Sequence, residues 1–145
     1  MQIDRTFSQG AQLLHLRTKG RGFYQITSNV IAFVNATKID TGLLTLFCRH
    51  TSASLLITEN ADPDVLKDLE AALARLAPEN ARYLHSNEGA DDMPAHIRTA
   101  LTQTHISIPV IQSMPTLGAW QGIFLYEHRH FPHDREIAMH LMGQS

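Results

Sequence analysis

Three separate stretches of this chain place histidines, hydroxyls and carboxylates close together, and such side chains could hold a metal ion and a polar substrate. They are residues 50–60, 87–96 and 127–130. A strand built only for a core alternates apolar and polar residues and does not gather such clusters. The three stretches together therefore predict a functional site.

Histidine stands out in the composition, with 9 among 145 residues. His50, His96 and His128 each stand among other polar residues in one of the three stretches. Three neutral imidazoles from three elements can bind zinc and leave a fourth position for water or substrate. We therefore expect these three to form a metal site. The alternative for any single histidine is an ordinary surface or hydrogen-bonded role.

The second stretch contains three carboxylates within five residues, those of Glu88, Asp91 and Asp92. Carboxylates so close together repel one another unless a cation or hydrogen-bond donors lie among them. A metal ion or a basic group of a substrate is therefore the expected partner. The alternative is that Asp91 or Asp92 only caps the helix that Pro94 opens.

A phosphorylated substrate would find candidate contacts in the first and third stretches. Arg129 could bind a phosphate through two hydrogen bonds, or could pair with Glu127 or Asp134 at the surface. Ser52 and Ser54 could bond to phosphate oxygens or only pair across strands. The chain has no glycine-rich phosphate loop, nucleophile elbow or dinucleotide fingerprint.

The composition is that of a single domain of 145 residues with an ordinary apolar share of 43%. A net charge of −2 gives no sign of nucleic acid or an anionic membrane as partner. No apolar run is long enough for a bilayer span, and the N-terminus lacks a secretion-signal pattern. A lone cysteine, Cys48, excludes an intramolecular disulfide and favours a cytoplasmic location.

The pattern of apolar residues predicts several strands interspersed with helices, and therefore an α+β fold rather than a doubly wound α/β fold. Strands are expected at 2–8, 11–18, 23–27, 43–58, 105–111, 118–128 and 135–141. Side chains alternate along a strand, so His50, Ser52 and Ser54 are expected on one face of the long strand 43–58.

Two or three helices are expected between these strands. One follows Ser28, where the side chain can cap the helix. A second begins at Asp62-Pro63, which places a capping oxygen before a proline, and ends at Pro78. A shorter third helix begins at Pro94.

The whole chain resembles the YjbQ-like family, also called secondary thiamine-phosphate synthases. The matching blocks are HTSAS at 50–54, ENAD at 59–62, EGADDMPAHI at 88–97, IPV at 108–110, LGAWQGI at 117–123 and EHR at 127–129. The blocks follow in the family's order and spacing. Several of them are long enough to be specific.

The resemblance implies two packed, largely antiparallel β-sheets with two to three helices, in subunits that assemble as a homotrimer. It implies an activity that joins a hydroxymethylpyrimidine diphosphate to a thiazole phosphate with release of diphosphate. The candidate catalytic carboxylates are then Asp62, Glu88, Asp91 and Asp92, which would hold an ion or orient the pyrimidine amine. Gln121, beside Trp120, joins Ser52, Ser54 and Arg129 as a candidate substrate contact.

Release of diphosphate requires positive charge beside the departing anion, and Arg129 and a divalent ion could supply that charge. Histidine ligands favour zinc, whereas magnesium prefers oxygen ligands and would arrive with the diphosphate. Two other functions stay open. One is metal-assisted hydrolysis of a small phosphorylated compound, and the other is a metal- or ligand-binding trimer without turnover.

One segment departs from the family's pattern. The chain has Ser113, Pro115 and Ala119 where glycine, leucine and threonine are usual in the family. Ala119 removes a hydroxyl beside Trp120, and with it a possible hydrogen bond to substrate or backbone. The changes at Ser113 and Pro115 affect a hairpin.

Overall fold

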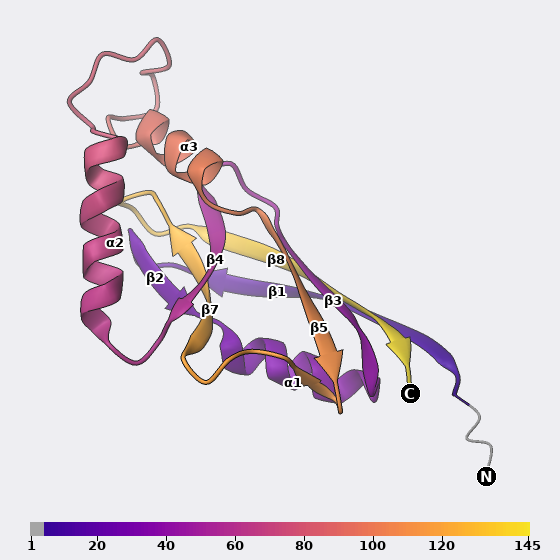
Figure 1. The fold of residues 1–145 in the computed structure, drawn as a ribbon. Coiled ribbons are helices and arrows are strands. Elements are labelled where there is room, and N and C mark those ends of the chain that lie inside the picture. Colours follow the sequence, from indigo (N-terminus) through magenta and orange to yellow (C-terminus); the bar gives the residue numbers. More distant parts are fainter. Residues whose placement is uncertain (1–4) are drawn as a thin grey trace.

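The computed structural model describes residues 5–145 and contains two antiparallel sheets and three helices (Figure 1). One sheet has five strands and the other three. This confirms the α+β class with two packed sheets that the sequence and the resemblance predict. Among the described residues, no helix combines the length and the apolar character needed to cross a membrane.

The larger sheet has the strand order β1-β8-β3-β5-β6. Its strands are β1 (Phe7–Arg17), β8 (Asp134–Gln144), β3 (Thr41–Cys48), β5 (His105–Ile111) and β6 (Met114–Pro115). The expected strands at 2–8 and 11–18 form one continuous strand, because β1 pairs with β8 without a break from Phe7 to Arg17. Residues 2–4 of the first expected strand lie outside the described part of the chain.

The smaller sheet has the order β2-β7-β4, with β2 (Gly22–Gln25), β7 (Gln121–Glu127) and β4 (Ala53–Glu59). The inner faces of the two sheets share one apolar core with α1 (Thr27–Thr37). Leu44 and Leu46 of β3, Leu55 of β4, and Ile123 and Leu125 of β7 are fully buried there.

The expected single strand over 43–58 is wrong, because the chain changes sheets at residues 49–52. The backbone at Cys48 and Arg49 still bonds within the larger sheet region, to Thr104 O and Glu136 O. From Ser52 onward the backbone bonds to β7, starting with His128 N to Ser52 O at 3.2 Å. Side chains before and after this break belong to different sheets, so alternation cannot place them on one face.

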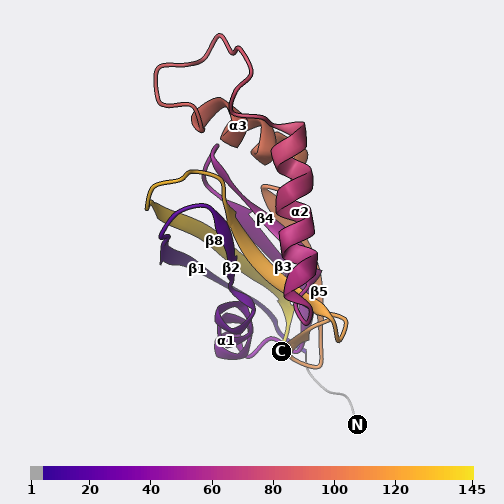
Figure 2. The same cartoon turned by 90° about the vertical axis from the view of Figure 1, so that its left-hand side faces the viewer.

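Helix α3 (Asp92–Leu101) lies at the other end of the molecule from α1, and α2 (Pro63–Leu76) runs along the side between these two ends (Figures 1 and 2). Asp62 caps α2 by accepting from Asp64 N at 2.9 Å, as the sequence predicts. No residue of α2 is fully buried, and Figures 1 and 2 show the helix alongside the smaller sheet. A long loop then leads to α3.

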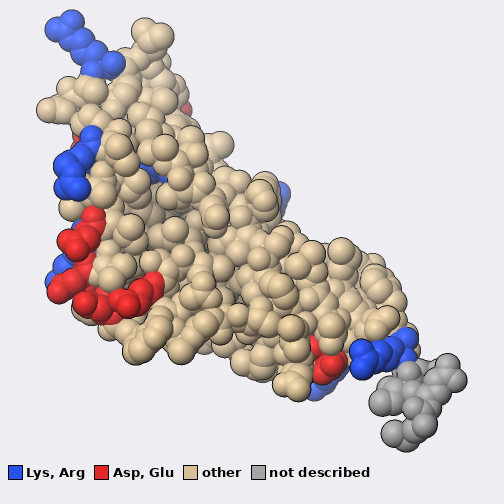
Figure 3. Space-filling model, viewed as in Figure 1, with Lys and Arg blue, Asp and Glu red and all other residues tan. Residues whose placement is uncertain are grey.

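Charged side chains are unevenly spread over the surface. On the face drawn in Figure 3, acidic residues gather over the N-terminal end of α2. The surface over β5 and β7 on the same face carries almost no Lys, Arg, Asp or Glu.

Candidate metal centre

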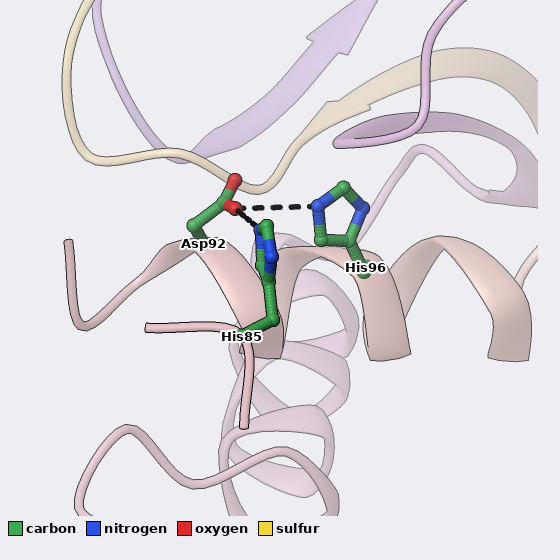
Figure 4. A group of neighbouring side chains, drawn as sticks. All are labelled: His85, Asp92 and His96. Carbon is green, nitrogen blue, oxygen red and sulfur yellow. Dashed lines mark hydrogen bonds and ion pairs between the residues drawn. The ribbon is translucent and has the colours of Figure 1, made fainter. Parts of the chain in front are cut away.

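Three side chains that can bind a metal ion meet at the start of α3: His85, Asp92 and His96 (Figure 4). Over residues 5–145 they form the one group in which a donor atom of each lies within 4.8 Å of the others. His85 Nε2 is 2.6 Å from Asp92 Oδ2, and His96 Nε2 is 3.3 Å from the same oxygen. Two imidazoles and a carboxylate are thus gathered around one point.

Local helix geometry explains two of these three positions. Asp92 begins α3, and His96 follows four residues later, one helical turn away on the same face. His85 comes from the exposed loop before α3 and reaches the pair across seven residues. The rings of His85 and His96 lie edge to face with their centroids 5.4 Å apart.

A backbone carbonyl fixes the orientation of His96. Its Nδ1 is 2.9 Å from Thr51 O, and a carbonyl can only accept, so Nδ1 carries the hydrogen. In the neutral ring Nε2 then turns an unshared electron pair toward Asp92 Oδ2. Two acceptors facing each other repel unless a second ring proton or a metal ion lies between them.

Arg129 holds the carboxylate of Asp92 in place. Its guanidinium donates to Asp92 Oδ1 at 2.8 Å, to Asp91 Oδ2 at 3.0 Å and to Glu88 O at 2.9 Å. Because Arg129 occupies Oδ1, Asp92 presents Oδ2 to the two histidines. Asp92 is 3% exposed, so this arrangement is shielded from bulk water.

Asp91 supports Arg129 and does not cap the helix through its side chain. It accepts from Arg129 and from the backbone N–H of His130 at 2.9 Å. Burial alone would raise the pKa of Asp91, but these two donors lower it below the usual value. The carboxylate is therefore ionised and fixed, and the capping alternative for Asp91 does not describe this structure.

Of the three histidines expected to share a metal ion, the structure places only His96 in this group. His50 Nε2 accepts from Glu136 N at 2.7 Å beside the larger sheet. His128 is completely buried, with Nε2 2.8 Å from Ser54 Oγ. Burial, followed by the nearby charges of arginines, lowers the pKa of His128 to about 3, so this ring is neutral.

The other predicted site residues are scattered. Asp62 caps the far end of α2, and Gln121 Oε1 accepts from Gly118 N at 2.8 Å at the start of β7. Ser52 Oγ accepts from Arg135 at 3.0 Å. Ser54 is buried between His128 and Thr102, so its hydroxyl is not free to bind phosphate.

Two features of the site escape the sequence reasoning. His85 was not expected in the metal site. The sequence did contain a signal for its two partners, because Asp92 and His96 are four residues apart on a predicted helix and therefore share a helix face. The second is the pairing of the fully buried Glu127 with Arg135, in which Glu127 also accepts from Thr18 at 2.7 Å. Arg129 therefore does not use Glu127 as its side-chain partner.

The centre lies between two hollows. A cavity of about 430 Å³ opens on the side of His96, and one of about 250 Å³ opens on the side of His85. Both are large enough to admit water and part of a small ligand. The nitrogen and oxygen donors suit zinc or another transition ion better than magnesium. Three protein ligands with room for a further one are typical of catalytic zinc sites.

This geometry defines the class of the protein: a two-sheet α+β fold with a histidine–aspartate–histidine group at the start of a helix. The family described as UPF0047 protein YjbQ-like matches residues 12–144, and this chain belongs to that family. A UPF0047 protein of Synechocystis is 51% identical over 140 residues, which cover 96% of this chain and 95% of the relative. YjbQ of Escherichia coli is 41% identical over 132 residues, covering 90% and 96%.

Solved structures agree with the family assignment. A YjbQ/UPF0047 protein of Clostridium acetobutylicum has a TM-score of 0.82 and 32% identity, and the match covers 88% of this chain and 97% of that one. A conserved hypothetical protein of Thermus thermophilus has a TM-score of 0.77 and 36% identity, with the same coverage of 88% and 97%.

Proposed function

We propose that this protein is a metal-dependent transferase acting on a small phosphorylated compound, with an ion held by His85, Asp92 and His96. One observation carries the proposal: the bond from His96 Nδ1 to Thr51 O leaves Nε2 aimed at Asp92 Oδ2. The family resemblance supplies the particular reaction, in which a hydroxymethylpyrimidine diphosphate is joined to a thiazole phosphate and diphosphate leaves.

Zinc is the proposed resident ion, because two of the three donors are imidazoles. Magnesium would accompany a diphosphate substrate, whose oxygens it prefers. When bound, the ion would supply positive charge to a phosphate oxygen or to a departing diphosphate.

The chain's own residues keep the ligands in position. Arg129 holds Asp92 through one oxygen, and Thr51 holds His96 through its carbonyl. Such outer contacts fix ring orientation and ligand basicity in metal sites. Asp91 would act on Arg129 instead of on substrate, since its carboxylate accepts from the guanidinium. Glu88 accepts from Arg129 through its backbone carbonyl, and its carboxylate stays a candidate for contact with substrate.

Metal analysis and a two-substrate assay test the proposal. Purified protein is stripped with a chelator, reloaded with zinc and supplied with both substrates and magnesium. We expect thiamine phosphate only from the reloaded protein. We expect zinc and product to be lost in His85→Ala, Asp92→Asn and His96→Ala, and retained in His15→Ala, whose ring is exposed.

Two further variants test the ligand set expected from the sequence. His50→Gln and His128→Gln show whether the ion also depends on those rings. Equal zinc content in the wild type and in all three variants at 85, 92 and 96 would reject the metal centre. Zinc binding without product would reject the transferase reaction and leave a binding function.

Hydrolysis is the second candidate, and the open sides of the centre favour it. Catalytic zinc sites with three protein ligands use the fourth position to activate water. Release of phosphate from a single substrate, without joining of the two, would support hydrolysis over transfer.

We also propose that the subunits form the trimer that the resemblance implies. The outer face of the larger sheet supports self-association, because it exposes large apolar side chains. They are Phe7, Leu13, Leu43, Phe47, Ile111 and Met142. Several large exposed apolar side chains on one face of a sheet are typical of an interface between proteins. Light scattering should give the mass of a trimer, and Phe47→Asp should shift it toward the monomer.

A further inference from the structure

A buried ion pair joins Glu127, at the end of β7, to Arg135, near the start of β8. Glu127 is fully buried and Arg135 is 4% exposed. Arg135 donates from Nε to Glu127 Oε1 at 2.8 Å and from a terminal nitrogen to Oε2, and Thr18 donates to Oε1 at 2.7 Å. Burial alone would raise the pKa of Glu127, but these donors lower it. The carboxylate is therefore ionised although it has no contact with water.

The pair holds the segment that orients His96. The terminal nitrogen of Arg135 also donates to Ser52, at 3.0 Å to Oγ and at 3.2 Å to the carbonyl oxygen. Ser52 follows Thr51, whose carbonyl oxygen is 2.9 Å from His96 Nδ1. The peptide unit that contains the Thr51 carbonyl is planar and ends at the Cα of Ser52, so fixing Ser52 restricts the direction of that carbonyl.

His50, on the other side of Thr51, is fixed by the same part of β8. Its Nε2 accepts from the backbone N–H of Glu136 at 2.7 Å. The residues before and after Thr51 are thus bonded to two consecutive residues of β8. This gives the polar run at 50–52 a role in supporting the centre, since its carbonyl, and not its side chains, contacts His96.

The pair also holds the backbone that carries Arg129. Glu127 Oε2 accepts from Arg129 N at 3.3 Å. The guanidinium of Arg129 in turn donates to Asp92 Oδ1 at 2.8 Å. One buried carboxylate is therefore connected to both outer contacts of the centre, the Thr51 carbonyl and the Arg129 guanidinium.

We propose that Glu127 is a positioning residue of the metal centre and that Arg135 transmits its effect to Thr51. The inference rests on the function proposed above, because it concerns two of the proposed ligands, His96 and Asp92. A buried ion pair is often no more stabilising than packed apolar side chains of similar volume. This pair instead supplies fixed geometry, because its hydrogen bonds run to two segments that are distant in the sequence.

Zinc affinity, measured by competition with a chromogenic chelator, tests the proposal. Glu127→Gln leaves one acceptor oxygen in place of two and removes the charge. Arg135→Lys keeps a charge opposite Glu127, but an ammonium cannot reach both oxygens of that carboxylate and Ser52 at once. We expect zinc binding about tenfold weaker in each variant, as for the loss of an outer contact. Tyr126→Phe is the control, since it removes a buried hydroxyl of the same strand that bonds to Arg98 and to no part of the proposed connection, and it should keep the wild-type affinity.

The Nδ1 hydrogen of His96 gives a second readout that needs no metal. In NMR spectra of the zinc-free wild type, the bond to Thr51 O should protect this hydrogen from exchange with water. We expect faster exchange in Glu127→Gln and Arg135→Lys, and wild-type exchange in Tyr126→Phe. A purely structural role of the pair would lower stability without this local change.

Weaker zinc binding and faster exchange in the two variants alone support the positioning role. Wild-type exchange in folded Arg135→Lys overturns it, as does an equal change in Tyr126→Phe, which would indicate a general effect of lost stability. If Glu127→Gln does not fold, Arg135→Lys decides. A wild type that binds no zinc rejects the metal centre, while the exchange rates in zinc-free protein still decide the positioning role.

Discussion

The ring of His96 donates from Nδ1 to the carbonyl of Thr51, 2.9 Å away and 45 residues earlier in the chain. This bond decides that Nε2 faces Asp92. The segment around Thr51 thus contributes a backbone carbonyl to the centre, although the sequence predicts a contribution from its side chains. In known metal sites, carboxylates and carbonyls accept a hydrogen bond from the ligating histidine and so fix the orientation of its ring. The carbonyl of Thr51 has this role for His96.

Arg129→Lys should weaken zinc binding by about 10- to 100-fold, the range found when outer contacts of a metal site are lost. A lysine ammonium cannot hold both Asp91 and Asp92 in the geometry of the planar guanidinium. Competition with a chromogenic chelator measures the affinity. Arg49→Lys is the matched control, because Arg49 forms a half-exposed pair with Glu136. Unchanged affinity in Arg129→Lys would mean that Asp92 needs no such support.

His128 should make stability depend on pH. The folded ring takes up a proton only near pH 3, whereas the unfolded ring does so near 6.5. The unfolded state therefore binds more protons between these values, and stability falls as the pH drops below 6.5. The slope approaches about 1.4 kcal/mol per pH unit for one such group. Urea unfolding between pH 6.5 and 5 should show a smaller slope in His128→Gln; an identical slope would contradict a buried neutral ring.

Glu70 should anchor α2. The fully buried Arg98 donates to Glu70 Oε2 at 2.8 Å, and Tyr126 also donates to this carboxylate. Glu70→Ala leaves the buried guanidinium with the Tyr126 hydroxyl but without its counter-charge; since the Glu70 side chain is 34% exposed, the cost should fall below the about 3–5 kcal/mol that is typical of a fully buried pair. Because no residue of α2 is fully buried, amide exchange in this helix should accelerate strongly. Asp68→Ala, on the exposed side of α2, should change stability by less than about 0.5 kcal/mol.

Ser113→Gly should stabilise the protein by about 0.5–1 kcal/mol. Ser113 and Gln112 have φ values of +64° and +52° in the turn between β5 and β6, a conformation that glycine adopts without strain. Ser113→Val should instead destabilise, because a branched side chain fits that conformation poorly. Thermal unfolding of the two variants measures both changes. A loss of stability with glycine would show that the serine side chain contributes to the turn.

Local rules in the sequence were sufficient for the three helices, for the α+β class and for part of the site, but not for the end of the strand that begins near residue 43. Asp62-Pro63 sets the start of α2, because a capping oxygen and a proline act within one turn. Asp92 and His96 share a helix face because of the helical repeat alone. Alternating apolar residues likewise predicted two-sided strands and the α+β class.

Tertiary structure decided which of these residues work together. The chain changes sheets at 49–52, and this separates His50 from Ser54; no local pattern marks the change, because its backbone partners, Thr104, Glu136 and His128, are distant in sequence. His85 enters the centre from a loop, and Arg129 bonds to Asp91 and Asp92, which lie 38 and 37 residues earlier in the chain. Hydrogen bonds and charge pairs of this kind depend on distance in space, which the fold alone sets. The sequence by itself therefore determined the helix that carries Asp92 and His96, and the packed structure decided their partners.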